Sequence, residues 1–505
     1  MWVNKLLYCW TGNKWEQNNH ELVRFIMVDA CKILEEIKEK AVENLINSDA
    51  EKEALMLIKG IVNDANFYFK DYNYVCNVIK ASSSFFTRDD VVFDDKPFLL
   101  GFNNGVFDLM KLCERNDDRS FKYNHEECFR PYQYDDFMTL STEYDYNDFD
   151  DVAQADIKDE LVNFFNAIMP NLDHQLLLLQ MLASGLDGLL YQRFFMLNGG
   201  GGNGKGSVFE LMRVLLGLYY LQGKNAILSD MAKANGASED IMDLKGKRFV
   251  LFEELGEIDN DEIKRLTGGG VTTGSRKYGS NQTFTLQSTF LGSFNEPAKL
   301  KKKPTGNSEL RRFIDFFFSK NFTDDLKKVG RKDVKNKMEI EWCLADKKYE
   351  TNDWRLNVRY GFLHLLLNVY RNFCDEKKGI KFTVPEDVMR RTENFLDAQN
   401  IFSAIFSDTY EKVDDMTKTI KVCDVWSVIS YHDDYKNLNF REKKKYNRKY
   451  FDEWLEEKVG SSNFGILNSG NRLKVIRGYV VCNENENKWN GGDFEEYEVV
   501  DEICI

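Results

Sequence analysis

The segment 194–217, FFMLNGGGGNGKGSVFELMRVLLG, is the stretch of this sequence that decides its fold. An apolar strand leads into a glycine-rich turn, and the lysine after the turn opens an amphipathic helix. Glycines allow backbone N–H groups to surround phosphate oxygens, and the beginning of a helix adds positive potential there. The order predicts an α/β fold with a nucleotide-binding loop, made of Gly199, Gly200, Gly201, Gly202, Asn203, Gly204, Lys205, Gly206 and Ser207.

The residue after the lysine departs from the usual pattern of such loops. A serine or threonine normally follows the lysine and supplies a hydroxyl to Mg²⁺, whereas here Gly206 stands before Ser207. Three alternatives are open: a working nucleotide site, a degenerate one, or a glycine turn with a structural role only. We expect ATP binding, because a structural turn would leave Lys205 unexplained. The Mg²⁺ would then be held by Ser207, or mainly by Glu253 and water.

Two glutamates follow an apolar strand further along the chain. The run Phe249–Phe252 is fully apolar and ends in Glu253 and Glu254. A nucleotide hydrolase needs one carboxylate for Mg²⁺ and another that polarises the attacking water. We therefore expect Glu253 to serve the metal and Glu254 to be catalytic. The alternative is a pair of solvated glutamates at the end of a strand.

An asparagine and a pair of arginines complete this series of motifs. The apolar run TFLGSF is followed directly by Asn295, whose amide is suited to hold the attacking water and sense the γ-phosphate. Arg311 and Arg312 precede the next apolar run, as expected of an arginine finger that enters the site of a neighbouring subunit. Arg312 is the first candidate, and the choice between the two is open. By itself, an Arg-Arg pair is more often a surface or salt-bridge feature.

The composition is that of a globular protein with an acidic balance of charge. The 505 residues are 43% hydrophobic and 30% charged, and the net charge is −14. This balance argues against a surface that coats nucleic acid, so any contact with DNA must be local and basic. Ten scattered cysteines without a C-x-x-C pair indicate reduced thiols and make zinc an unlikely cofactor. We expect a soluble intracellular protein with no membrane span.

Three further segments carry structural predictions. Residues 20–80 have helical periodicity, and Asn103-Asn104-Gly105 between two apolar runs predicts a tight hairpin. The acidic, tyrosine-rich segment 133–159 has the composition of a connector. On the first predicted helix one apolar face is expected to hold Val23, Ile26, Met27, Ala30, Ile33 and Leu34.

Together these motifs make the sequence resemble a superfamily 3 helicase, an AAA+ ATPase. It is most similar to the viral and phage primase–helicases of the poxvirus type. The loop GGGGNGKGS (199–207) and the strand GKRFVLFEELGE (246–257) match the family's pattern. The most diagnostic part is IKRLTGGGVTTGSRKYGSNQTFTLQSTFLGSFNEP (263–297), which joins the acidic strand to the asparagine. One departure lies within it at Gly270, where relatives often have an acidic residue.

The resemblance extends over nearly the whole chain and implies a multidomain α/β protein. LLGFNNGVFDLM resembles part of the family's helical domain, and YFDEWLEEKVG with NRLKVIRGYVV resembles its winged-helix region. The domains implied are a mainly helical N-terminal domain at 1–155, an AAA+ P-loop ATPase core at 156–325, a helical extension at 326–385 and a winged-helix-like domain at 386–505. A primase domain often precedes the helical domain, and none is evident here.

The function implied by the resemblance is that of an ATP-dependent replicative DNA helicase in viral or phage replication. Its cofactors would be ATP and Mg²⁺, its assembly a ring that is usually hexameric, and its substrate single-stranded or forked DNA. A separate primase or polymerase is an expected partner, and the host cytoplasm or nucleus the expected compartment. The alternatives are another P-loop DNA motor, or a nucleotide-dependent structural hub or loader that recruits a primase or polymerase.

Contacts with DNA are expected from the hairpin that follows the acidic strand. There, Arg276, Lys277 and Tyr278 combine positive charge with a ring on which a base can stack. Lys264, on the preceding helix, is a further candidate. The alternative for all four is that they are ordinary exposed residues of a helix and a hairpin.

Overall fold

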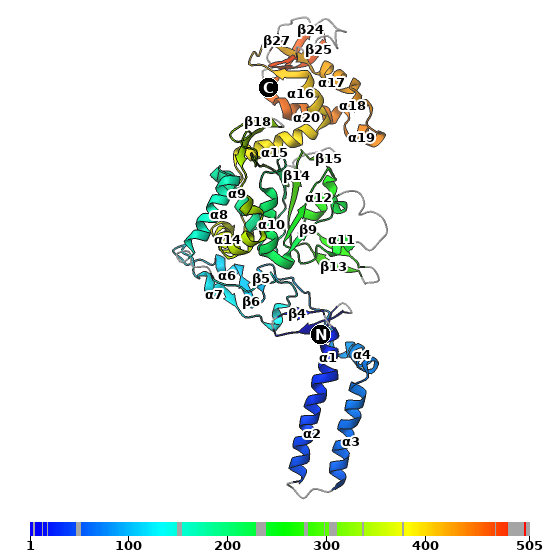
Figure 1. Cartoon of the computed structure of the whole chain (residues 1–505). Coiled ribbons are helices and arrows are strands. Elements are labelled where there is room, and N and C mark those ends of the chain that lie inside the picture. Colours follow the sequence, from blue (N-terminus) through cyan, green and yellow to red (C-terminus); the bar gives the residue numbers. More distant parts are fainter. Residues whose placement is uncertain are drawn as a thin grey trace. The chain divides into compact units, whose positions relative to one another are not determined.

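The computed structural model divides into two compact units (Figure 1). The first comprises residues 1–256, 262–297 and 316–385, and the second comprises 257–261, 298–315 and 386–505. The structure describes residues 1–3, 6–12, 14–17, 19–46, 52–148, 154–228, 239–276, 281–296, 298–301, 311–335, 338–375, 378–469, 471–482 and 499–500.

A five-stranded sheet lies at the centre of the α/β region. Its strands, in sheet order, are β16 (Phe313–Phe317), β8 (Phe194–Asn198), β14 (Thr289–Phe294), β10 (Phe249–Phe252) and β9 (Tyr220–Gln222). The pairs β8–β14, β14–β10 and β10–β9 are all parallel. Every residue of β8 and β10 is buried, as expected for parallel strands that are covered on both faces. The expectation of a multidomain α/β fold is confirmed, and the structure adds that its central sheet is parallel in these three pairs.

Four helices of the first unit pack on one another beside this sheet (Figure 1). Local sequence fixes where they begin. The side chain of Asn171 accepts hydrogen bonds from two backbone N–H groups in the first turn of α9, and Thr351 does the same for one N–H of α14. Stacked rings of Phe165 and Phe362 join α8 to α14. The helices are α8 (Ala155–Ile168), α9 (Leu172–Ala183), α10 (Lys205–Leu216) and α14 (Asn352–Phe373).

The N-terminal segment contains the helices that the periodicity predicts, but the side chains that are buried differ in one helix. A π-helical turn, Phe25–Ala30, separates α1 (Asn19–Arg24) from α2 (Cys31–Ile46). A π-turn takes more residues than an α-turn, so it rotates every later side chain around the axis. Ile33, expected on the buried face, is therefore 46% exposed, and Cys31 is buried instead. The helices α3 (Lys52–Phe69), α4 (Tyr72–Ala81) and α5 (Ser83–Phe86) follow.

The region before the sheet also contains strands, so residues 1–155 are less uniformly helical than expected. Short pairs β1 (Trp2–Val3) with β2 (Leu6–Leu7) and β3 (Cys9–Trp10) with β4 (Trp15–Glu16) precede the helices. After the helices, β5 (Leu99–Phe102), β6 (Gly105–Asp108) and β7 (Phe129–Arg130) form an antiparallel sheet. The tight hairpin predicted at Asn103-Asn104 is confirmed.

A buried arginine forms hydrogen bonds that link this hairpin to the α/β region. Arg248 is 2% exposed, and its guanidinium donates hydrogen bonds to the carbonyls of Leu99 and Leu186. It also lies over the ring of Tyr219, 4.5 Å from the centroid. The arginine at the start of the acidic strand therefore has a structural role.

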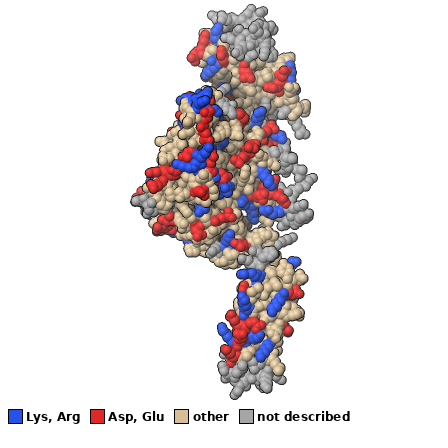
Figure 2. Space-filling view, viewed as in Figure 1, with Lys and Arg blue, Asp and Glu red and all other residues tan. Residues whose placement is uncertain are grey.

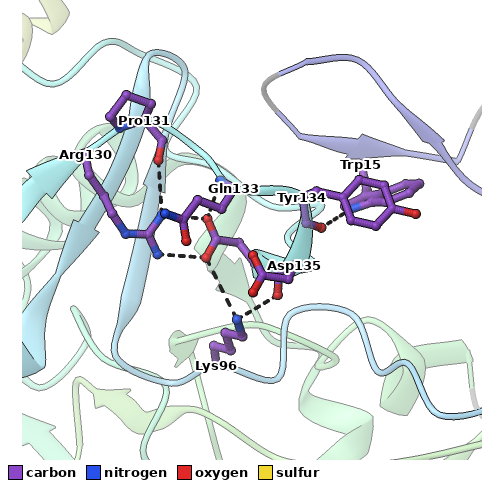
Figure 3. A network of polar contacts seen from close by, with 8 residues as sticks. Trp15, Lys96, Arg130, Pro131, Gln133, Tyr134 and Asp135 are labelled. Atoms are coloured by element: carbon purple, nitrogen blue, oxygen red, sulfur yellow. Dashed lines mark hydrogen bonds and ion pairs between the residues drawn. The ribbon is translucent and has the colours of Figure 1, made fainter.

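The acidic segment that begins at residue 133 is fixed by polar contacts rather than acting as a loose connector (Figure 3). Asp136 is 2% exposed and accepts hydrogen bonds from the Arg130 guanidinium at 2.7 and 2.8 Å and from the backbone N–H of Gln133. Lys96 donates to the carbonyl of Asp135, and the indole of Trp15 donates to the carbonyl of Tyr134. Residues 149–153, within the predicted connector, lie outside the described residues.

A small three-stranded sheet follows β16 in the chain. Strand β17 (Lys320–Thr323) pairs in parallel with β19 (Met338–Leu344), and β18 (Lys332–Lys335) pairs with β19 antiparallel. The segment 326–385 was expected to be helical. Its first part instead forms β18 and β19, and the helix α14 begins only at Asn352.

The second unit combines helices with a C-terminal hairpin. The helices are α15 (Glu386–Gln399), α16 (Ile401–Thr409), α17 (Val422–Tyr431), α18 (Asp433–Lys436), α19 (Phe440–Lys445) and α20 (Arg448–Val459). Phe402, Phe451 and Trp454 form the aromatic centre of its core. The hairpin consists of β24 (Phe464–Ser469) and β25 (Asn471–Arg477), which pair antiparallel. Its assignment as a winged helix stays a prediction.

No helix among the residues that the structure describes is both long and apolar enough to cross a membrane.

Candidate active site

A cavity of about 680 Å³ opens where three parallel strands of the central sheet end. The carboxyl ends of β8, β10 and β14 lie at one edge, which is where open α/β sheets bind ligands. The predicted glycine loop, both glutamates and the asparagine meet there. The lining residues are Gly200, Gly201, Gly202, Asn203, Lys205, Gly206, Phe209, Gln222, Gly223, Lys224, Asn225, Glu253, Glu254, Ser293 and Asn295.

The glycine loop has the backbone that its sequence predicts. Gly199 and Gly204 have φ angles of +153° and +83°, which residues with a Cβ rarely adopt. A Cβ on Gly199 would collide with the amide nitrogen of Asn203, and one on Gly204 would lie 2.9 Å from Ile168. The loop ends at Lys205, the first residue of α10, so the positive end of that helix lies at the cavity.

Lys205 and Asn203 are the buried polar residues of the loop. Lys205 is 4% exposed, and its ammonium group donates to the carbonyl oxygens of Gly199 at 2.6 Å and Phe294 at 3.2 Å. Asn203 is 3% exposed, and its Oδ1 accepts a hydrogen bond from the Lys205 N–H. The Nδ2 of Asn203 is buried without a hydrogen-bond partner. Because such an atom is costly, a donor held at this cavity fits an anionic ligand.

The two glutamates follow β10 with different surroundings. Glu253 is half-buried, and its carboxylate accepts a hydrogen bond from Gln222 Nε2 at 2.6 Å. Burial and the nearby charges of Glu210 and Glu254 raise the pKa of Glu253, while the Gln222 hydrogen bond opposes that shift. Glu254 is exposed and has a φ of +53°, a left-handed conformation in which non-glycine residues are strained. Strain of this kind clusters at functional sites.

Asn295 and Ser207 differ in their relation to the cavity. Asn295 is exposed at the end of β14 and lines the cavity together with Ser293. Ser207 is half-buried in the first turn of α10 and is not among the lining residues. Of the two residues expected to serve Mg²⁺, the structure thus brings Glu253 to the cavity and leaves Ser207 outside its lining.

The residues predicted to contact DNA do not line this cavity. Lys264 is half-buried on α12 (Asn260–Thr267). Arg276 is exposed just after β12 (Val271–Gly274) and forms an ion pair with Asp243 at 3.4 Å. The predicted hairpin is confirmed, because β12 pairs antiparallel with β13 (Gln282–Thr285). Lys277 and Tyr278 lie outside the described residues.

The arginine pair belongs to the second unit, directly before β16. Arg312 is 8% exposed, whereas Arg311 is exposed. A finger that enters a neighbouring subunit must reach the surface. By this criterion Arg311 is the better candidate of the two, whereas Arg312 was the first candidate from the sequence alone.

Several residues near the cavity were not singled out from the sequence. Gln222 and Asn225 hold Glu253 from β9 and the turn after it, and the Asn225 amide donates to the Glu253 carbonyl at 2.9 Å. Asn321, on β17, lies beside the loop: its amide is 3.6 Å from the position of a Cβ on Gly200. The positions of β9 and β17 near the site follow from the order of strands in the fold. The sequence contains no motif that predicts this order.

The described residues contain no group of three or more His, Cys, Asp and Glu side chains that could hold a metal by itself. Glu253 and Glu254 are the carboxylates at the cavity.

Comparisons with known proteins place this chain among distant relatives of viral proteins. Residues 197–312 match a family described as a family of unknown function (DUF5906). The chain is 26% identical over 442 residues to "Putative helicase L207/L206" of Acanthamoeba polyphaga mimivirus, a match that covers 82% of this chain and 42% of that protein. It is 23% identical over 243 residues to "Putative primase C962R" of African swine fever virus, covering 47% of this chain and 22% of that protein.

A third relative is "Uncoating factor OPG117" of vaccinia virus, 24% identical over 303 residues, with 56% of this chain and 35% of that protein covered. The chain therefore spans less than half the length of these curated relatives. Among solved structures, the A form apo structure of the NrS-1 C terminal region covers 64% of this chain and 75% of that chain, with a TM-score of 0.35 and 11% sequence identity.

Proposed function

We propose that this chain is an ATP-dependent DNA motor of the superfamily 3 helicase type that acts in viral DNA replication. The observation that carries the proposal is the cavity itself. It brings Lys205, Glu253, Glu254 and Asn295, from three strands far apart in the sequence, to one edge of a parallel sheet. The similarity to viral proteins named as a helicase and a primase supports a role in DNA replication.

Each residue has a role that its position supports. The loop N–H groups and the start of α10 would hold the phosphates of ATP, with Lys205 exchanging its carbonyl contacts for phosphate oxygens. Glu253 would hold Mg²⁺, which neutralises charge that develops on the phosphates. Glu254 would polarise the attacking water, and Asn295 would position that water and contact the γ-phosphate.

Assembly and DNA contact belong to the proposal as well. Subunits would form a ring, usually a hexamer, in which Arg311 or Arg312 of one subunit completes the site of the next. The β12–β13 hairpin with Arg276, and Lys264 beside it, would contact single-stranded DNA. A structural hub for a separate primase or polymerase would use the same surfaces but would not hydrolyse ATP.

Two substitutions separate binding from chemistry. In Lys205→Ala we expect loss of both ATP binding and hydrolysis, because the phosphates lose their cation. In Glu254→Gln we expect ATP binding to persist while hydrolysis falls by at least about 100-fold, because the amide does not act as a base. Nucleotide binding and steady-state hydrolysis are measured on the same preparations.

Matched controls are Lys59→Ala and Glu257→Gln, which change exposed residues outside the cavity lining. Both controls should retain wild-type binding and hydrolysis. Wild-type hydrolysis in Glu254→Gln would exclude the proposed chemistry, and a wild type without any hydrolysis would favour the hub.

A further inference from the structure

The turn between β17 and β18, residues 325–331, carries cations that no acidic side chain neutralises. Lys327, Lys328 and Arg331 are exposed, and within the described residues none of the three forms an ion pair. Of the neighbouring acids, Asp324 pairs with Lys347 at 2.8 Å, and the Asp325 carboxylate accepts a hydrogen bond from the Lys327 N–H, so three cations stand against one unpaired carboxylate in the turn. We call residues 325–331 the basic turn.

The basic turn is held rigidly by its own backbone. Lys327 N–H donates to the Asp325 carboxylate, and Lys328 N–H donates to the Asp325 carbonyl. Gly330 N–H donates to the carbonyl of Trp342 on β19, and the Trp342 N–H donates to the carbonyl of Arg331. A positive φ of 81° at Gly330 allows this close pairing. Cations on a preorganised turn bind a polyanion with little loss of entropy.

The surface of the turn is mixed, with an apolar residue among the cations. Leu326 is 73% exposed and adjoins Lys327 and Lys328 in the chain. Figure 2 shows Lys and Arg side chains gathered over the region where Figure 1 labels β18. In a chain with a net charge of −14, such a local surplus of positive charge is the kind of surface that a nucleic-acid backbone requires.

We propose that the basic turn is a second nucleic-acid contact of this chain, in which Lys327, Lys328 and Arg331 bind backbone phosphates. The side chain of Leu326 would then lie against sugars or bases. The inference rests on the proposed role on DNA, but it does not depend on ATP hydrolysis or on the β12–β13 hairpin. An acidic protein partner is the competing occupant, and the experiment below distinguishes it.

The test is the salt dependence of single-strand binding by the full chain without nucleotide. Binding of a fluorescein-labelled oligothymidine is followed by anisotropy in wild type and in the triple variant K327A/K328A/R331A. Each lost phosphate contact lowers the slope of log affinity against log salt by about 0.7, so the triple variant should lower it by about 2. Basal ATP hydrolysis without DNA should be unchanged, since none of the three residues lines the cavity.

Two further variants make the result specific. K327R/K328R/R331K keeps the charges and should keep the wild-type slope. K40A/K59A/K80A removes three exposed charges from the N-terminal helices and should also leave the slope unchanged. A wild-type slope in K327A/K328A/R331A would overturn the proposal, because the turn would then make no phosphate contact. A slope lost equally in the N-terminal control would overturn it too, because the effect would then be one of net charge.

Discussion

Asp187 is the residue whose burial has the clearest consequence for stability. It is buried in the first unit and accepts hydrogen bonds from the hydroxyls of Tyr191 at 2.7 Å and Tyr370 at 2.8 Å, and from the N–H of Leu189. Burial raises the pKa of Asp187 to about 6, and these hydrogen bonds and the charge of Arg248 oppose the shift.

A raised pKa predicts how stability changes with pH. Between pH 3.8 and about 6 the folded chain binds a proton that the unfolded chain releases, so the free energy of unfolding falls as pH rises through this window. Over this window the ionisation of Asp187 lowers the free energy of unfolding by about 3 kcal/mol. Asp187→Asn should remove this pH dependence. Denaturant unfolding of both proteins at pH 4 to 7 measures the difference, and a difference that is independent of pH would contradict the assignment.

Substitutions of the two arginines before β16 should differ in their effects on the free energy of unfolding and on ATP hydrolysis. Arg312 is buried, so Arg312→Ala should lower the free energy of unfolding by roughly 1–3 kcal/mol. Arg311 is exposed, so Arg311→Ala should leave stability within about 0.5 kcal/mol of wild type but abolish hydrolysis if it acts on the neighbouring subunit.

Mixing Arg311→Ala with Lys205→Ala subunits provides the control for this role. Each variant supplies what the other lacks, so mixed rings should regain hydrolysis at sites that combine an intact loop with an intact finger. Inactive mixtures, or active Arg311→Ala rings, would exclude Arg311 as a finger.

Among the strands and helices, β17 is the strand whose backbone forms a hydrogen bond with the glycine loop. The N–H of Phe322 donates to the Gly202 carbonyl at 2.6 Å. The Asn321 side chain beside it is 7% exposed, and its Oδ1 has no hydrogen-bond partner. The amide nitrogen of Asn321 lies 3.6 Å from the position of a Cβ on Gly200, so the side chain packs beside the loop. We therefore predict that Asn321 supports nucleotide binding indirectly, by holding the glycine loop in place.

Asn321→Ala should weaken nucleotide binding without destabilising the fold. Ligand binding raises the melting temperature by mass action, so the rise produced by a non-hydrolysable ATP analogue should be smaller in the variant than in wild type. Asn437→Ala, an exposed asparagine of the second unit, serves as the control. A full wild-type rise in Asn321→Ala would show that the residue has no part in binding.

Strands and turns with a local pattern could be predicted from the sequence, but contacts made through sheet order could not. The run 249–252 is fully apolar, and the runs 194–198 and 289–294 are mostly apolar. Parallel strands bring their carboxyl ends together, so the loop, Glu253-Glu254 and Asn295 could be expected to meet. Gln222 comes from the edge strand β9, whose place beside β10 depends on packing.

Two elements, α2 and the strands within 326–385, differ from what the sequence predicts. A π-turn inside an otherwise regular helix changes the facing of α2 without leaving a mark in the hydrophobic pattern. Strand β19 alternates apolar with acidic residues from Met338 to Trp342, whereas β18 (KDVK) has no alternation. A strongly helical segment follows both strands, so a helix was expected over 326–385.

At the scale of the whole molecule, the acidic balance of charge confines any DNA contact to local basic surfaces. The chain has a net charge of −14, yet the proposed helicase activity would require it to hold a polyanion. The described parts of the β12–β13 hairpin and the basic turn are the two surfaces that we propose for this purpose. The predicted domain boundaries, ring assembly and partners remain predictions about a chain that spans less than half of its curated relatives.

Coupling of ATP hydrolysis to DNA by this chain can be measured in one assay. Steady-state ATP hydrolysis by the full chain is followed with and without single-stranded DNA, with Lys205→Ala as the background. We expect hydrolysis that single-stranded DNA stimulates several-fold and that Lys205→Ala abolishes in both conditions. Hydrolysis that is absent, or that proceeds at the same rate with and without DNA, would contradict this expectation.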